Sequence, residues 1–137
     1  MKKHLRCLLI LFVSGAGIAQ SPQLDWVRSF GVVGDATNCS SAIIDSNKSV
    51  IVTGRFRGTV DVDGGVGVYN LVSKGDQDMF VAEYDSSGNF KWAFHIGGPQ
   101  GDIVYDIKFD SQGNIFVLGM FQGTADMDPG SGVQNFT

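Results

Sequence analysis

Glutamate is almost absent from this 137-residue sequence, and cysteine occurs only twice. Of the 14 acidic residues only Glu83 is a glutamate, while glycine occurs 19 times. Aspartate and glycine favour turns and disfavour helix interiors, so an all-helical protein is excluded. Charged residues make up 18% of the chain and apolar residues 43%. This balance excludes a disordered polyelectrolyte and permits one folded core.

The first residues have the layout of a secretion signal. Basic residues precede a short apolar stretch, Cys7 to Val13, and Gly17-Ile18-Ala19 places small residues before a cleavage site. We predict that residues 1–19 are a cleaved signal peptide and that residues 20–137 reach the periplasm, the cell surface or the medium. The alternative, a transmembrane anchor, would need about 20 apolar residues, and the apolar stretch is far shorter.

Cleavage would change the charge of the chain. The mature part would hold 7 basic and 14 acidic residues, a net charge of −7. Its basic residues are scattered along the sequence, whereas nucleic-acid binding depends on clustered Lys and Arg, so nucleic acid is excluded as a partner. Cys39 would be the one remaining cysteine, which excludes an intramolecular disulfide in the mature chain.

An internal repeat is the most informative feature of the sequence. Asp45 to Val72 aligns without a gap on Asp110 to Thr137, with 13 of 28 positions identical. Upstream, Trp26 and Trp92 are equivalent at an offset of 66. The unit is therefore about 65 residues long. Residues 20–137 hold about 1.7 units, truncated at the C-terminus, and we expect the missing parts to come from a longer gene product or from another chain.

Each unit has the pattern of short antiparallel strands. Val50 to Phe56 and Ile115 to Phe121 are rich in β-branched and aromatic residues around a central glycine. Asp78 to Asp85 alternates in a way that predicts one buried face, with Glu83 reaching water. Further strands are expected at residues 25–30, 41–45, 90–96 and 103–110.

The D-x-x-G-N segments predict how these strands are joined. In Asp85 to Asn89 and in Asp110 to Asn114 a glycine stands fourth, where a type I turn followed by a left-handed residue closes a hairpin. In the first copy, Lys48 holds the glycine position. A non-glycine residue in that conformation costs about 1 kcal/mol, so this turn is expected to be strained.

These motifs together resemble the bacterial β-propeller repeats, abbreviated SBBP, of exported and cell-surface proteins. The matching elements are the D-x-x-G-N hairpins, the G-x-F-x-G-T-x-D-x-D segments at 54–63 and 119–128, and W-A followed by Gly97-Gly98. The first copy departs from the pattern at Lys48 and at Gly64, where the second copy has a proline. The resemblance implies an all-β partial propeller, because a ring needs four to eight four-stranded blades.

Two pairs of aspartates are candidates for binding Ca²⁺. Each pair lies at the end of a predicted strand and is followed by glycine, and Ca²⁺ prefers hard oxygen ligands from a tight loop. The third acid and the bidentate glutamate of an EF-hand are absent. The alternative interpretation is that the carboxylates cap turns through local hydrogen bonds, and it is the one we favour. The four residues are Asp61, Asp63, Asp126 and Asp128.

Trp26 and Trp92 are candidates for ligand binding because amphipathic aromatic rings dominate contacts with sugars and peptides. Their repetition favours a structural role instead, in which each ring fills the space between adjacent sheets. No catalytic constellation is found: His95 is the one histidine of the mature part, and G-x-S-x-G is absent.

The sequence therefore predicts a non-enzymatic exported scaffold that binds protein or glycan surfaces, or further propeller repeats, and that has no cofactor unless the aspartates hold Ca²⁺. Two other functions stay open. The units could form the propeller portion of a larger secreted hydrolase or lyase, or they could form an assembly module in which incomplete units complete each other between chains.

Overall fold

The computed structural model describes residues 7–13, 23–31 and 37–137, and this part of the chain is all β with no helix. The strands follow the chain in the order β1 (Cys7–Val13), β2 (Gln23–Phe30), β3 (Asn38–Ile44), β4 (Val50–Phe56), β5 (Thr59–Asp61), β6 (Asn70–Val72), β7 (Asp78–Tyr84), β8 (Phe90–Ile96), β9 (Ile103–Phe109), β10 (Ile115–Met120), β11 (Ala125–Asp126) and β12 (Asn135–Phe136).

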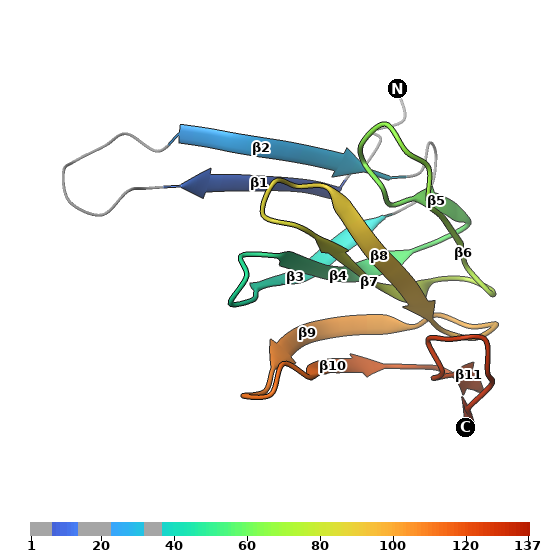
Figure 1. The fold of residues 1–137 in the computed structure, drawn as a ribbon. Helices are drawn as coiled ribbons and strands as arrows, with labels where there is room; N and C mark the ends of the chain where they lie inside the picture. The colour runs from blue at the N-terminus through green and yellow to red at the C-terminus, as the bar shows by residue number, and fades with distance from the viewer. Residues whose placement is uncertain (1–6, 14–22, 32–36) are drawn as a thin grey trace.

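The strands form a stack of antiparallel sheets (Figure 1). A four-stranded sheet in the order β3-β4-β7-β8 lies in the middle, with the β1–β2 pair on one side and the β9–β10 pair on the other. The small hairpins β5–β6 and β11–β12 follow β4 and β10. The predicted strands are confirmed, with ends that differ by up to three residues, but the sequence did not predict the small hairpins.

The two copies of the repeat have matching local structure. β3, β4 and the β5–β6 hairpin of the first copy correspond to β9, β10 and the β11–β12 hairpin of the second, and β2 corresponds to β8. Both β3–β4 and β9–β10 carry a bulge opposite the same part of the strand, before Gly54 and before Gly119. The chain is therefore a partial β-propeller, made of antiparallel hairpin repeats that do not close a ring.

The D-x-x-G-N turns have the predicted geometry. In each turn one carboxylate oxygen accepts the backbone N–H groups two and four residues on, at 2.9 and 2.7 Å for Asp45, 2.8 and 2.9 Å for Asp85, and 2.8 and 2.9 Å for Asp110. The fourth residue has a positive φ, 76° at Gly88 and 85° at Gly113. Lys48 adopts the same conformation, with φ 64°, so the strained turn is confirmed.

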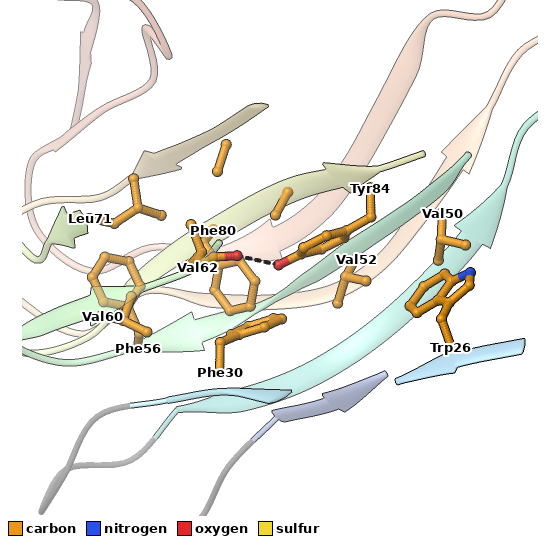
Figure 2. Packing of buried hydrophobic residues seen from close by; sticks show 12 residues of the cluster. Trp26, Phe30, Val50, Val52, Phe56, Val60, Val62, Leu71, Phe80 and Tyr84 are labelled. Atoms are coloured by element: carbon orange, nitrogen blue, oxygen red, sulfur yellow. Dashed lines mark hydrogen bonds between the residues drawn. The ribbon is translucent and has the colours of Figure 1, made fainter. Parts of the chain in front are cut away.

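Two hydrophobic clusters hold the stack together, one on each face of the middle sheet. The first joins this sheet to β2 and is dominated by aromatic rings, with Phe30 against Phe80 and Tyr84 at centroid distances of 5.9 and 6.0 Å (Figure 2). In this cluster the Tyr84 hydroxyl donates a hydrogen bond to the Val62 carbonyl oxygen at 2.5 Å. The second cluster joins the sheet to β9 and β10 through Ile51, Val81 and Ile107.

The prediction of a single buried face on β7 is corrected by the structure, in which both faces are covered and Glu83 alone in this strand is partly open to water. Phe80 and Ala82 pack into the first cluster, Val81 packs into the second, and Glu83 is half-buried. The physical reason is that a flanking pair of strands covers each face of the middle sheet. The alternation in this strand therefore distinguishes two interfaces rather than core from solvent.

The predicted signal peptide lies mostly outside the described residues, which begin at residue 7 and omit residues 14–22. Its apolar stretch forms β1, which pairs antiparallel with β2 in the full-length chain. Cleavage before Gln20 stays a prediction. In this full-length chain Cys39 is disulfide-bonded, so the expectation of no intramolecular disulfide applies only once residues 1–19 have been removed.

Candidate functional site

The paired aspartates form the same polar loop in both copies of the repeat. Asp61 Oδ1 accepts hydrogen bonds from the Asp63 N–H at 3.1 Å and the Tyr69 N–H at 2.8 Å. Asp126 Oδ1 accepts the equivalent pair, from the Asp128 N–H at 3.1 Å and the Gln134 N–H at 2.8 Å. One carboxylate thus fastens both ends of the loop between the strands of each small hairpin.

The second aspartate of each pair caps the turn that follows it. Asp63 Oδ1 accepts the Gly65 N–H at 2.9 Å, and Asp128 Oδ1 accepts the Gly130 N–H at 2.7 Å. In the described part of the chain no three acidic, histidine or cysteine side chains gather where they could hold a metal ion. The hydrogen bonds that each of these aspartates accepts are those of turn capping.

The two loops differ in one ion pair. Lys74 Nζ lies 2.8 Å from Asp126 Oδ2, and this hydrogen bond, with the Gln134 and Asp128 amides, lowers the pKa of Asp126 to about 2. Lys74 lies between β6 and β7 of the first unit, so the pair connects one unit to the next. No described lysine or arginine makes the equivalent ion pair with Asp61.

Trp26 is a packing residue. It is buried in the first cluster, and its indole Nε1–H donates to the Ser86 carbonyl oxygen at 3.0 Å. The ring covers the turn between β7 and β8 so closely that a Cβ on Gly88 would lie 2.6 Å from Trp26 Cδ2. A ring enclosed by the turn of the neighbouring sheet offers no face to a ligand.

Trp92 has the equivalent place in the sequence but a different environment. It is half-buried on β8, stacked on Phe94 with a centroid distance of 5.6 Å and an interplanar angle of 7°, and it packs at the edge of the second cluster. The β7–β8 turn covers Trp26, and among the described residues no equivalent turn covers Trp92. The structure therefore does not bring the two tryptophans into one site.

A buried acidic cluster near His95 was missed by the sequence analysis. Asp78 Oδ2 accepts a hydrogen bond from the Lys74 N–H at 3.1 Å and lies 2.8 Å from His95 Nδ1. Asp102 Oδ2 accepts the Gly98 N–H at 2.8 Å. Both carboxylates are fully buried, and burial raises the pKa of Asp102. A run of glycines before Asp102 was the only signal in the sequence, and it does not indicate a buried acid.

This cluster is a joint between two units of the stack. Asp78 and His95 belong to the middle sheet, whereas Asp102 precedes β9, and its Oδ1 accepts the Gln122 N–H at 3.3 Å after β10. His95 also packs edge-on against Phe56 at 5.8 Å. Among the described residues no hydroxyl or thiol group is hydrogen-bonded to His95 Nε2, so the histidine has no nucleophile beside it to activate.

The described residues contain no helix that is long and apolar enough to cross a membrane.

Comparisons with known proteins give two relatives. The chain is 28% identical over 131 residues to the uncharacterized WD repeat-containing protein L264 of Acanthamoeba polyphaga mimivirus, a match that covers 85% of this chain and 9% of that protein. It is 31% identical over 111 residues to the regulatory protein FlaEY of Caulobacter vibrioides, covering 78% of this chain and 12% of that protein. No protein-family model and no solved structure matches.

The chain thus spans about a tenth of the length of these relatives. The similarity to a WD repeat-containing protein agrees with the stack of antiparallel hairpin units that the structure shows.

Proposed function

We propose that this chain is a non-enzymatic, exported β-propeller repeat module that acts as a binding scaffold at the bacterial envelope or outside the cell. The observation that supports it best is that the side chains singled out as site candidates make contacts that build the fold. The aspartates fasten turns, and the buried rings join neighbouring sheets. The WD repeat-containing and regulatory relatives support binding to proteins rather than catalysis.

Export rests on the sequence of residues 1–19 and on the resemblance to the SBBP repeats. The experiment is expression of the full chain in a bacterial host, followed by cell fractionation and intact-mass measurement. The expected product starts at Gln20 and is found outside the cytoplasm. In an Ala19→Arg variant, which removes the small residue next to the cut, the uncleaved chain should accumulate. An uncleaved, cytoplasmic wild-type chain would overturn the export proposal.

The alternative of a hydrolase is less well supported. Its strongest group is His95, whose Nδ1 lies 2.8 Å from the buried Asp78 carboxylate as in a catalytic triad, but among the described residues no hydroxyl or thiol group is hydrogen-bonded to its Nε2. Assembly between units is better supported, because the Lys74–Asp126 ion pair and the Ser41–Asp106 hydrogen bond already join the two units of this chain.

A further inference from the structure

A cavity of about 550 Å³ lies between strand β2, the loop of the β5–β6 hairpin and the turn that joins β7 to β8. Its volume is within the range of small-ligand sites, about 300–1,000 Å³. Two charged side chains, an amide and an aromatic ring line it together with the backbone of a glycine-rich loop. These residues are Arg28, Asp63, Asn89, Phe90, Gly65 and Gly67.

The loop and the turn that form two walls of this cavity are fastened by carboxylates. Asp61 Oδ1 accepts the N–H groups of Asp63 and Tyr69, which lie at the two ends of the loop. In the turn, Asp85 accepts the backbone N–H of Asn89 at 2.9 Å and its side-chain Nδ2–H at 3.0 Å. The Asn89 amide oxygen is therefore held in a fixed place. A site formed in advance loses less conformational entropy when a ligand binds.

The aromatic ring of the cavity is also held in place. Phe90 is half-buried and packs on Tyr69 with a centroid distance of 4.8 Å and an interplanar angle of 38°. It packs edge-on against Tyr84 at 6.1 Å on another side. The Tyr69 hydroxyl in turn donates to the Ala93 carbonyl oxygen at 3.2 Å. The Phe90 ring thus offers the cavity a fixed apolar surface.

The two charged groups of the cavity are not used up by one another. Asp63 Oδ1 accepts the Gly65 N–H at 2.9 Å, and no described donor is hydrogen-bonded to Asp63 Oδ2. A Cβ on Gly67 would collide with Oδ2, so the glycine leaves room beside this oxygen. Arg28 donates one N–H to the Val27 carbonyl oxygen at 3.0 Å. Its guanidinium has five N–H donors, and it forms no ion pair with a described carboxylate.

The combination of these side chains belongs to one copy of the repeat. Asp63 has a counterpart in Asp128, as expected for a turn cap. The position of Arg28, two residues after the tryptophan, is held in the second copy by Phe94, which packs against the second hydrophobic cluster. A guanidinium thus replaces a packed aromatic ring at this place. Structural positions recur in both copies, so a residue that departs from the repeat indicates a separate role.

We propose that this cavity binds a neutral glycan, with one sugar ring on Phe90 and its hydroxyl groups between Arg28 and Asp63. A guanidinium only donates hydrogen bonds and a carboxylate only accepts them, so the ligand has to do both. Sugar hydroxyls do both, and the apolar C–H face of a sugar ring packs on an aromatic ring. The opposite charges of the two side chains favour a neutral ligand over an anion or a cation. The site rests on the proposed scaffold function and gives it a class of ligand.

The experiment titrates the isotopically labelled full chain with neutral pentasaccharides and follows NMR chemical shifts. The probes are cellopentaose, laminaripentaose, chitopentaose, mannopentaose and xylopentaose. We expect saturable binding of at least one probe, with shift changes concentrated in residues 63–67 and 89–90 and at the Arg28 Nε–H. No saturable binding by any of them would overturn the proposal, and so would changes centred on Trp92.

Asp63→Asn tests the carboxylate without removing the turn cap, because the amide oxygen still accepts the Gly65 N–H. This variant should bind the sugar at least about tenfold more weakly, as expected when one hydrogen bond to a charged group is weakened. Asp128→Asn is the matched control: Asp128 caps the equivalent turn through the Gly130 N–H at 2.7 Å, outside this cavity. Equal weakening in both variants would reduce Asp63 to a turn cap and overturn the site.

Arg28→Gln tests the other charged group and does not depend on the loop. It should also weaken binding at least about tenfold. Arg57→Gln is its control, because Arg57 is exposed and pairs with Asp76 at 3.5 Å outside the cavity. Thermal melts establish that each variant is folded. Unchanged affinity in a folded Arg28→Gln variant would contradict the proposed contacts.

The charge of the ligand is tested with probes of the same size. The fully deacetylated form of chitopentaose keeps its rings and linkages but is cationic, and pentagalacturonate is anionic. Both should bind more weakly than the best neutral probe. Tighter binding of either one would overturn the assignment to a neutral glycan. Export and cleavage are measured without sugar, so failure of this site is distinguishable from failure of the proposed function.

Discussion

Ser41 Oγ donates a hydrogen bond to Asp106 Oδ1 at 3.2 Å, and these two residues are 65 positions apart, one repeat length. Equivalent positions of successive units therefore touch each other directly. The Lys74–Asp126 ion pair and the contacts of Ile107 with the middle sheet join the same two units. Because the stacking is regular, the offset of the sequence repeat predicts which surfaces of successive units are in contact.

The strained turn at Lys48 gives the first prediction. Lys48→Gly should raise the free energy of unfolding by up to about 1 kcal/mol, because glycine adopts a positive φ without steric cost. Gly113 is the matched control: its φ is also positive, and a Cβ there would meet nothing within 4 Å. Gly113→Ala should destabilise through backbone strain alone. Urea denaturation measures both, and a lower midpoint for Lys48→Gly would contradict the turn assignment.

Trp26 and Trp92 should differ in their contribution to stability. Trp26→Ala should cost about 3–5 kcal/mol, as for other buried aromatic residues replaced by alanine, because the ring covers Gly88 and donates to the Ser86 carbonyl oxygen. Trp92→Ala should cost clearly less, since that ring is only half-buried. Chemical denaturation followed by circular dichroism compares the two variants. Equal losses would mean that Trp92 is covered in solution.

The Asp61 carboxylate is predicted to act as a hydrogen-bond acceptor and not as a Ca²⁺ ligand. Asp61→Asn keeps an oxygen for the Asp63 and Tyr69 N–H groups and should stay close to wild type. Asp61→Ala should lose about 1–2 kcal/mol, because each of these hydrogen bonds contributes about 1 kcal/mol. Thermal melts with added CaCl₂ and with EDTA should coincide. A rise in the midpoint with CaCl₂ that Asp61→Asn abolishes would instead establish a metal site.

The Lys74–Asp126 ion pair predicts a shifted titration. The pKa of Asp126 is lowered to about 2, chiefly by the hydrogen bond from Lys74. Lys74→Met should raise this pKa, but only part of the way to the ordinary value, because the Gln134 and Asp128 amides still donate to the carboxylate. NMR titration of the aspartate carboxyl carbons measures the change. Asp110 does not contact Lys74 and should titrate unchanged.

Asp102 should make stability depend on pH with the opposite sign from most aspartates. Burial raises the pKa of Asp102 in the folded state, so its stabilising contribution is complete below the unfolded value of about 3.9 and is lost as the pH rises through the folded-state value. Asp102→Asn does not titrate at this position. It should therefore gain stability relative to wild type as the pH is raised from about 3 to about 7.

Asp110→Asn is the control for this pH dependence. Hydrogen bonds from the Asn114 side chain and backbone lower the pKa of Asp110, so its contribution is present above the unfolded value and is lost as the pH falls through the folded-state value. This variant should lose stability relative to wild type as the pH rises. Denaturant midpoints at several pH values measure both curves. Parallel curves for the two variants would contradict the burial of Asp102.

The amino-acid sequence was enough to predict the period of the repeat, the position of most strands and the geometry of the hairpin turns. These features are local. The conformation of Lys48 follows from five consecutive residues whose aspartate fastens the turn, and strand positions follow from short runs of β-branched and aromatic side chains. The repeat then indicated that the sheets stack on one another, because two segments of similar sequence need similar surroundings to bury their apolar side chains.

Which surfaces are covered could be learned only from the packing of the sheets. The two buried faces of β7, the different environments of Trp26 and Trp92, and the joint between Asp78, His95 and Asp102 all depend on the sheet that packs alongside. A side chain has the same sequence neighbours whether or not a second sheet lies against it. Its burial, and the pKa or binding role that follows from burial, is set by atoms tens of residues away.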